Sequence, residues 1–388
     1  MKSNYEPLGK HIRLVDYRNS EEVTSTVLGI SIDKEFMPSV ANVIGTDLSR
    51  YKLISKGLFA CNPMHVGRDE RLPIALYEKD NASIVSPAYF MFEIIDRDVL
   101  NEEYLMMWFR RPEFDRECWF MTDGSVRGGI TWDDLCRIQL PVPPYERQLD
   151  VVESYRAITR RIAMKKEIND NLEATAMSLY KSWFIDYEPF DLDDEGLPVG
   201  WCKEKLNDKL STSTQSINPQ KMDCDFVWHY SIPAYDNEKL PSKDTPSSIL
   251  SNKYIVPQNA ILVSKLNPDT KRIWRSVPCF ENAICSTEFI VFSTKEPTHR
   301  AFYYLLFNTG SFIDFLVSNA TGSTNSRMRV KPASSLDFEF ICPPNEVIDS
   351  FCRKVEPLLQ KIEENHLEIR KLKELIPIAV AKMMSSSR

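Results

Sequence analysis

The sequence has little glycine and histidine and no long apolar run. Its 388 residues include 12 Gly, 5 His and 24 Pro, with 43% hydrophobic and 27% charged residues. That balance is ordinary for globular domains and disfavours disordered, collagen-like and solenoid proteins. No run approaches the ~18 apolar residues of a membrane-spanning helix, and Met1 to Lys10 contain no apolar signal core. We therefore expect a cytoplasmic protein with no membrane partner.

Motifs for metals, cofactors and catalysis are also missing. The nine cysteines form no C-x-x-C pair and no His lies at zinc spacing, so we expect no metal and mostly buried, reduced thiols. No phosphate-binding glycine motif is present, so we expect no cofactor. A DNA methyltransferase needs an Asn or Asp before a Pro-Pro-aromatic loop, but Val142 precedes Pro143, Pro144 and Tyr145. The sequence predicts a protein that is not itself an enzyme.

A self-comparison shows an internal repeat of about 200 residues. Residues 121–146 align with residues 320–346: each block has a small polar loop with an arginine, an alternating apolar segment typical of a strand, and a Pro pair. A long periodic segment follows each Pro pair. The repeat predicts two copies of one structural plan.

The segments after the Pro pairs have apolar residues at steps of three and four, which is typical of amphipathic helices with a narrow seam. Two unrelated surface helices would explain the pattern, but the matching positions favour two helices that pair as a coiled coil. Chain direction makes that pair antiparallel. We expect Pro357 to begin or kink the second helix and Pro377 to break it near its end.

The remaining segments mix short β-rich runs with helical stretches at 102–114 and 300–317. The predicted fold class is α+β, with two mixed α/β domains joined by two long antiparallel helices and related by an approximate two-fold axis. The expected domains are residues 1–145 and 190–344, with helices at 146–189 and 345–388.

Positive charge is local, because the whole chain carries 48 Lys+Arg against 55 Asp+Glu and a net charge of −7. Such an average does not report the field at one surface. Arginine can fork to guanine, asparagine to adenine, and small polar loops can meet phosphates. A solvated surface role remains the alternative for each single arginine. The candidate DNA-binding residues are Arg68, Ser125, Arg127, Lys265, Asn267, Lys271, Arg272, Arg275, Arg327 and Arg329.

Several segments resemble one known family. The frame "PVPPYERQ" (141–148), "LEATAMSLYKSWFIDYEPF" (172–190) and "GLPVGW" (196–201) resembles the central region of specificity subunits of type I restriction–modification systems. The stretch "VEPLLQKIEENHLEIRKLKEL" (355–375) is similar to that family's distal region, and "WHYSIPAYD" (228–236) and "LVSKLNPDTKRIW" (262–274) to one class of its target-recognition domains.

The resemblance implies a non-catalytic subunit that binds double-stranded DNA at a bipartite site. It also implies recruitment of two modification (methyltransferase) subunits and of restriction (translocase and nuclease) subunits, in a role in DNA methylation and phage defence. We expect the partners to dock on the helices and on Trp183, Phe184, Tyr187 and Phe190. A self-contained methyltransferase or restriction enzyme and a structural adaptor without a DNA role remain the alternatives.

Overall fold

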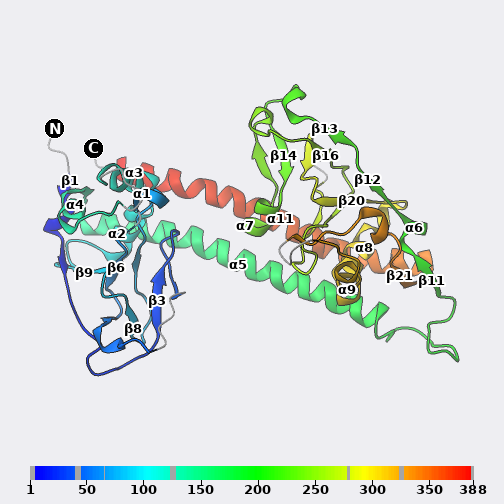
Figure 1. Cartoon of the computed structure of the whole chain (residues 1–388), viewed down its shortest axis with the longest axis horizontal. Helices are drawn as coiled ribbons and strands as arrows, with labels where there is room; N and C mark the ends of the chain where they lie inside the picture. Colours follow the sequence, from blue (N-terminus) through cyan, green and yellow to red (C-terminus); the bar gives the residue numbers. More distant parts are fainter. Residues whose placement is uncertain are drawn as a thin grey trace. The chain divides into compact units, whose positions relative to one another are not determined.

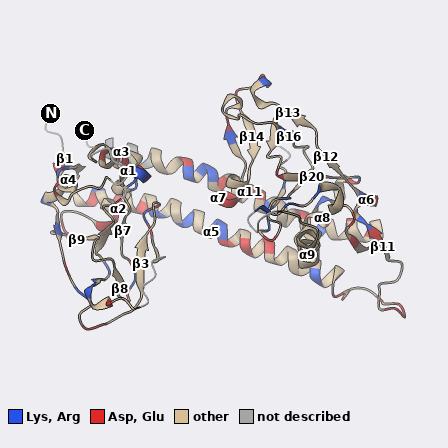
Figure 2. Cartoon of the chain, in the orientation of Figure 1, with Lys and Arg blue, Asp and Glu red and all other residues tan. Residues whose placement is uncertain are grey.

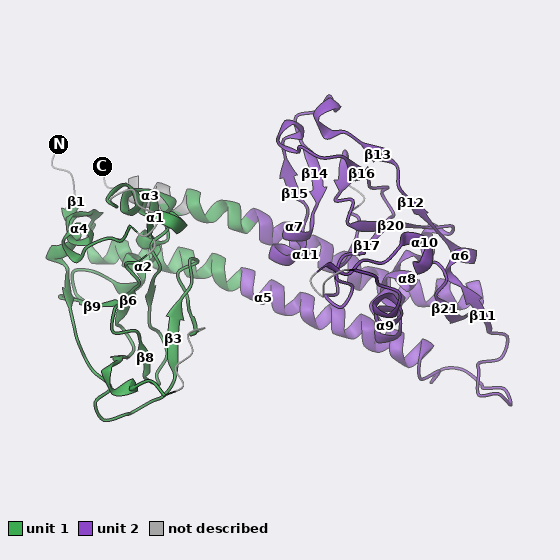
Figure 3. Cartoon of the chain, in the orientation of Figure 1, with its two compact units in different colours: residues 1–161, 372–388 green, residues 162–371 purple. Residues whose placement is uncertain are grey.

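The chain folds into two compact units that each mix helices and strands, as the α+β prediction requires (Figure 1). The computed structural model describes residues 5–39, 45–64, 66–122, 128–277, 280–322 and 327–385. Unit 1 comprises Met1–Arg161 and Leu372–Arg388, and unit 2 comprises Ile162–Lys371 (Figure 3). In these ranges, no helix combines the length and the apolar character needed to cross a membrane.

Unit 1 contains two four-stranded sheets and one short ladder. The first sheet has the order β2-β9-β6-β7 and is antiparallel; the second has the order β4-β3-β8-β5, in which β3 and β8 are parallel. Strands β1 and β10 pair near the start of the long helix. The strands are β1 (Tyr5–Pro7), β2 (Ile12–Leu14), β3 (Val27–Ile30), β4 (Phe36–Pro38), β5 (Lys52–Ile54), β6 (Phe59–Cys61), β7 (Ile74–Leu76), β8 (Ser83–Val85), β9 (Phe90–Ile94) and β10 (Gln139–Pro141).

Unit 2 repeats this plan strand by strand. Its sheets have the orders β12-β20-β17-β18 and β15-β14-β19-β16-β13, with β14 and β19 parallel, and β11 pairs with β21. Only β13 lacks a counterpart among the described strands of unit 1. The strands are β11 (Cys202–Lys205), β12 (Leu210–Ser213), β13 (Ser216–Ile217), β14 (Val227–Tyr230), β15 (Ser242–Asp244), β16 (Lys253–Ile255), β17 (Ile261–Ser264), β18 (Ile273–Arg275), β19 (Ala283–Cys285), β20 (Phe289–Thr294) and β21 (Glu339–Cys342).

The helical stretches predicted upstream of each repeat loop are each divided into two helices. Pro112 occupies the first turn of the second helix in unit 1, and the Thr309 side chain caps the corresponding helix in unit 2 by accepting from the Phe312 amide. The short helices are α1 (Val66–Asp69), α2 (Glu102–Phe109), α3 (Pro112–Phe120) and α4 (Trp132–Arg137) in unit 1, and α6 (Leu206–Lys209), α7 (Ile232–Glu238), α8 (Arg300–Phe307), α9 (Gly310–Ser318) and α10 (Pro332–Ser335) in unit 2.

Two long helices, α5 (Tyr145–Phe184) and α11 (Asn345–Ser385), follow the two Pro pairs. Helix α11 begins at Asn345 and continues through both prolines, so the expectations that Pro357 begins the helix and that Pro377 breaks it were wrong. A kink at Pro357 stays a prediction. A proline removes one helical hydrogen bond, but the neighbouring Val355 and Leu359 are buried in the core of unit 2, and this packing stabilises the helical backbone there.

In unit 2 the two helices run antiparallel, because rising numbers in α5 meet falling numbers in α11. Lys165 forms a 2.7 Å ion pair with Glu368, and the Asn365 amide donates to the Asn169 Oδ1 at 2.8 Å. Further along, the Trp183 ring lies 5.6 Å from that of Phe351. Figure 2 shows basic and acidic residues interspersed along both helices. A polar layer therefore interrupts the otherwise apolar seam.

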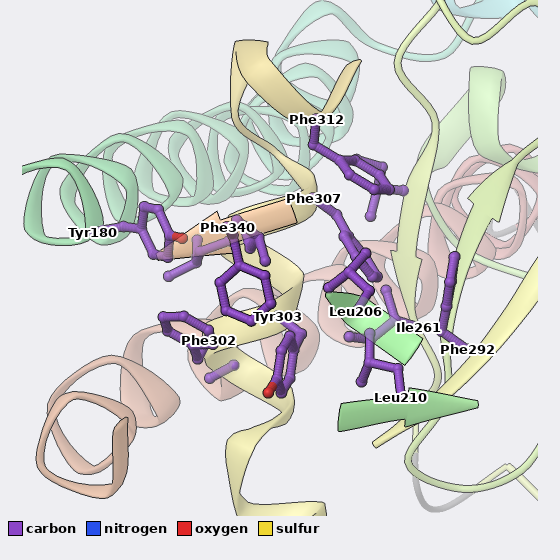
Figure 4. Packing of buried hydrophobic residues seen from close by; sticks show 14 of the residues in the cluster. Tyr180, Leu206, Leu210, Ile261, Phe292, Phe302, Tyr303, Phe307, Phe312 and Phe340 are labelled. Carbon is purple, nitrogen blue, oxygen red and sulfur yellow. The ribbon is translucent and has the colours of Figure 1, made fainter. Parts of the chain in front are cut away.

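The core of unit 2 joins both long helices to the sheet. Tyr180 of α5 lies beside Phe302 of α8, with ring centres 5.6 Å apart, and Phe302 lies 6.2 Å from Phe340 of β21 (Figure 4). Phe307 and Phe312 stack at 4.5 Å and continue this core toward Phe292 on β20. These aromatic contacts fix the position of the sheet, and of the loops at its ends, relative to the helices within the unit.

Candidate nucleic-acid interface

In unit 2 the structure brings together two loops that are about 60 residues apart in the sequence. The Asn267 amide donates to the Met328 carbonyl at 2.8 Å, and the Val330 amide donates to the Lys265 carbonyl at 3.0 Å. The Asn267 side-chain oxygen also accepts from the Met328 amide at 3.1 Å. We call residues 264–272, 320–322 and 327–331 the loop pair of unit 2. It contains six of the predicted DNA-binding residues: Lys265, Asn267, Lys271, Arg272, Arg327 and Arg329.

Unit 1 has the same arrangement in residues 62–64, 66–73, 121–122 and 128–131, the loop pair of unit 1. The Gly67 amide donates to the Gly128 carbonyl at 3.0 Å, and the Ile130 amide donates to the Pro63 carbonyl at 3.1 Å. A Cβ on Gly129 would lie 2.8 Å from the Pro63 oxygen, so this close approach requires glycine. Three of the four bonded residues, Gly67, Gly128 and Ile130, lie exactly one repeat of 200 before their counterparts Asn267, Met328 and Val330. The repeat in sequence is thus a repeat in tertiary contacts.

The predicted residues of unit 1 are only partly described. Ser125 and Arg127 lie outside the described residues. Arg68 lies in α1 with an exposed side chain, and its guanidinium donates two hydrogen bonds to the neighbouring Asp69 carboxylate, at 2.6 and 2.9 Å. That carboxylate raises the pKa of Arg68. Arg68 is accessible, but part of its charge is balanced by Asp69.

The cations of the unit 2 loop pair differ in their surroundings. Arg327 is exposed, and within the described ranges no ion pair of its guanidinium is present. Arg329 is about half exposed and binds Glu288 through two hydrogen bonds of 3.0 and 3.1 Å, which raise its pKa. Lys265 is partly buried. Arg327 is therefore the most available of the three for a phosphate or a base edge.

Lys271 and Arg272 lie at the end of the hairpin loop between β17 and β18, and their side chains contact other parts of unit 2. The Lys271 ammonium donates to the Asn308 carbonyl at 2.9 Å. Arg272 forms two hydrogen bonds with the Asp236 carboxylate, at 2.6 and 2.9 Å, and its side chain is only 14% exposed. Both side chains fasten the hairpin loop to neighbouring helices, and this contact competes with any contact to DNA.

Arg275 is not available at the surface, contrary to the expectation that it contacts DNA. Its side chain is 5% exposed and lies inside unit 2, 2.5 Å from a Glu356 oxygen and 3.4 Å from a Glu363 oxygen of α11. Arg300 approaches the same two carboxylates at 3.8 Å. The sequence could not separate Arg275 from its neighbours, because β18 is buried on both faces whereas the loop residues before it are more exposed.

An arginine that sequence reasoning missed lies at the unit 1 loop pair. Arg71 is half exposed and forms a 3.2 Å ion pair with Asp33 of the β3–β4 turn, just as Arg272 pairs with Asp236 of the β14–β15 connection. It lines an open cleft of about 620 Å³, together with Arg110 and Arg116. Arg71 lies 201 residues before Arg272, close to the repeat length, and this offset could have identified it as a candidate.

Comparisons with known proteins show relatives of this chain. No protein-family model matches the sequence. The chain is 23% identical over 317 residues to the type I restriction enzyme MjaIX specificity subunit of Methanocaldococcus jannaschii, covering 75% of this chain and 70% of that protein. It is 19% identical over 377 residues to the HindI specificity subunit of Haemophilus influenzae, covering 79% and 78%. The chain is a relative of type I specificity subunits. The resemblance seen in the sequence is confirmed.

The fold agrees with that relationship. A crystal structure of a type I restriction–modification S subunit from M. genitalium matches over 98% of this chain and 96% of that chain, with a TM-score of 0.58 at 12% identity. At that identity the likeness concerns the fold alone. The mixed α and β architecture predicted for a type I specificity subunit is therefore confirmed.

The aromatic residues predicted to bind partner subunits of such a complex pack largely against unit 2 itself. Phe184 is 8% exposed, and its ring lies 4.7 Å from Phe351 and 4.9 Å from Phe302. Tyr187 and Phe190 contact Trp201, with ring centres 5.5 and 4.9 Å apart. Trp183 is partly buried against Phe351. These rings stabilise the junction of α5 with unit 2, which limits the surface they offer to another protein.

Three kinds of group could take part in catalysis within the described ranges: metal-binding clusters, cysteine thiols and the Pro-Pro-Tyr segment. In those ranges no cluster of three or more His, Cys, Asp or Glu could hold a metal ion. The eight described cysteines are free thiols, and burial raises the pKa of Cys285 to about 12, which makes it a poor nucleophile at neutral pH. Val142, at the Pro-Pro-Tyr segment, packs its side chain against the unit 1 core at the start of α5.

Proposed function

We propose that this chain is the DNA sequence-specificity subunit of a type I restriction–modification complex, in which units 1 and 2 each read one half of a bipartite site. The observation that carries the proposal is the loop pair, which recurs with equivalent backbone bonds in both units. The relationship to the MjaIX and HindI specificity subunits supports it. The chain itself is non-catalytic, and partner subunits supply methylation and cleavage.

The loop pairs have the chemistry that DNA recognition needs. Backbone bonds join the described segments of each pair, which lowers the ordering cost of presenting nearby side chains to a groove. In unit 2, Arg327, Arg329 and Lys331 follow one another with no acid between residues 327 and 336. Such local positive charge favours phosphate contact in spite of the net charge of −7. Arginine forks would then distinguish guanine in the major groove.

The long helices would act as a ruler between the two half-sites. Helix α5 has 40 residues and continues from unit 1 into unit 2 without a break in its secondary structure. At 1.5 Å per residue, such a helix is about 60 Å long. A continuous helix of fixed length would hold the half-sites at a fixed spacing, near one helical turn of DNA between their centres.

Partner subunits would dock on the exposed faces of the helices. Met164 and Ile168, which are 59% and 43% exposed, lie four residues apart on one face of α5, and Ile185 at its end is 48% exposed. Apolar residues at this spacing on a helix suit a partner helix. Because the fold is repeated, we infer that two modification subunits bind, and that restriction subunits join the complex through them.

The experiment that tests the function is to map methylated adenines in DNA from cells that produce this chain with its modification subunits. We expect one bipartite motif with a constant spacer. The isolated chain, incubated with DNA and labelled S-adenosylmethionine, should transfer no methyl group. Methyl transfer by the chain alone would contradict the proposal and support the self-contained enzyme.

A second measurement separates the proposal from a structural adaptor. Sequence-dependent DNA binding by the assembled complex should weaken with salt, by about 0.9 log unit per log unit of salt for each phosphate contacted. Binding without sequence preference or salt dependence would favour the adaptor.

A further inference from the structure

The last turn of α3 exposes two large aromatic side chains. Phe120 is 87% exposed and Trp119 is 44% exposed. Other aromatic residues of α2 and α3 are buried: Phe109 and Phe114 are at most 2% exposed, and Trp108 is 3% exposed. A contiguous pair of exposed aromatic rings is characteristic of contact surfaces.

This pair lies at the unit 1 loop pair. Asp115 of α3 accepts a hydrogen bond of 3.1 Å from the Leu72 amide, which lies in the loop between β6 and β7. It also accepts one of 2.7 Å from the buried Lys34 ammonium. These bonds hold α3 against the loop. At its C-terminal end, the Thr122 hydroxyl donates to the Trp119 carbonyl at 2.8 Å, so the aromatic pair directly precedes the repeat segment of the loop pair.

The same place in unit 2 carries different chemistry. The Thr122 amide donates to the Trp119 carbonyl as the Ala320 amide donates to the Val317 carbonyl, so Trp119 and Phe120 correspond to Val317 and Ser318 at the end of α9. Both are exposed. The Ser318 hydroxyl donates to the Phe315 carbonyl at 2.9 Å, which orients the side chain. The two units thus share a scaffold but differ in the residues presented beside the loop pair.

We propose that these residues determine base specificity: Trp119 and Phe120 make apolar contacts through their large rings with the half-site of unit 1, and the smaller Val317 and Ser318 contact that of unit 2. This inference rests on the proposed function. Double-stranded DNA is the occupant because the aromatic pair is continuous with the loop pair that carries Arg68. Aromatic side chains contact thymine methyl groups or enter between base steps, whereas a serine hydroxyl recognises base edges by hydrogen bonds.

The test is a double variant, Trp119→Val with Phe120→Ser, which places the unit 2 residues in unit 1. It is assembled with the modification subunits, and binding is measured by selection from a library of random half-sites. We expect about tenfold or greater weakening of the parent motif and an altered base preference in one half only. The Arg327→Ala variant identifies the other half as that of unit 2.

The control is Leu250→Asn, which alters an 86% exposed apolar residue of unit 2 outside its loop pair. It should bind as the parent does. Thermal unfolding of the double variant should match the parent, because both side chains are exposed.

Three results would overturn the inference. An unchanged motif and affinity would show that the rings do not meet DNA. Loss of assembly with the modification subunits, with base preference retained in the complex that still forms, would show a protein contact instead. If the parent complex has no sequence preference at all, the proposed function fails and this inference fails with it.

Discussion

Replacing Arg275 with methionine would remove the central cation of a buried ion-pair cluster in unit 2. Arg275 is 5% exposed and lies within 2.5 Å of a Glu356 oxygen and 3.4 Å of a Glu363 oxygen, whose side chains are 29% and 18% exposed. Burial already raises the pKa of Glu363, although Arg275 and Arg300 oppose this shift. Methionine keeps most of the side-chain volume, so the change isolates the loss of charge.

The expected cost follows from the burial of the carboxylates left behind. Removing one partner of a buried pair costs about 3–5 kcal/mol. Arg300 remains 3.8 Å from both glutamates, and Glu356 is partly exposed, so we expect a loss at the lower end, about 2–4 kcal/mol. For a unit of this size that corresponds to a melting temperature lower by about 5–15 °C.

The assay is urea unfolding followed by tryptophan fluorescence, with the transition of unit 2 analysed separately from that of unit 1. The matched control is Arg329→Met, which removes an arginine from an exposed, solvent-screened pair with Glu288 and should shift the unfolding midpoint much less than Arg275→Met does. Adding Glu363→Gln to the Arg275→Met variant should restore part of the stability. An Arg275→Met variant as stable as the parent but deficient in DNA binding would refute the buried placement.

Three further predictions concern DNA recognition and pH. Arg327→Ala should weaken binding to the half-site of unit 2 by about 1–3 kcal/mol without changing base preference at the half-site of unit 1. Selection from a half-site library measures this, and equal loss of binding at both half-sites would contradict the division between units. Deleting four residues, about one turn, from α5 and from α11 in register beside Asn169 and Asn365 should shorten the methylated motif's spacer and leave its half-sites unchanged; an unaltered spacer would rule out the ruler. Burial lowers the pKa of His366 to about 4. As the pH falls, the His366 imidazole is therefore protonated in the unfolded chain before it is protonated in the folded chain. The free energy of unfolding falls as pH drops from about 6.5 to 4, by about 2 kcal/mol at pH 5. Urea titrations at pH 7 and pH 5 should show a smaller difference in His366→Gln, and an equal difference would mean that His366 is not buried as a neutral ring.

Local pattern was sufficient for the long helices and for the repeated plan. The period of three to four in the segments after the Pro pairs depends only on which residues share a face of a helix, and α5 and α11 begin at Tyr145 and Asn345, 200 residues apart. The helix start expected at Pro357 was wrong, because the local cost of that proline is outweighed by packing of neighbours such as Val355, which no local rule can evaluate.

The candidate site was predictable only in part. Loop composition pointed to Lys265, Asn267 and Arg327, which the structure brings into one loop pair. The same composition pointed to Arg275, which lies inside unit 2, and to Phe184, which belongs to its aromatic core. A cation or an aromatic ring has the same local signature whether it serves the fold or a partner.

The sequence by itself determined the duplication, the two seams, the mixed α and β character and the family relationship, because each is a property of spacing along the chain. Only the tertiary structure decided that Met328 bonds to Asn267, that Arg275 meets Glu356, and that Phe120 lies exposed beside a loop pair. These are matters of contact and burial between segments tens of residues apart. Their free energies depend on which groups lose water together, and the order of residues alone does not specify that.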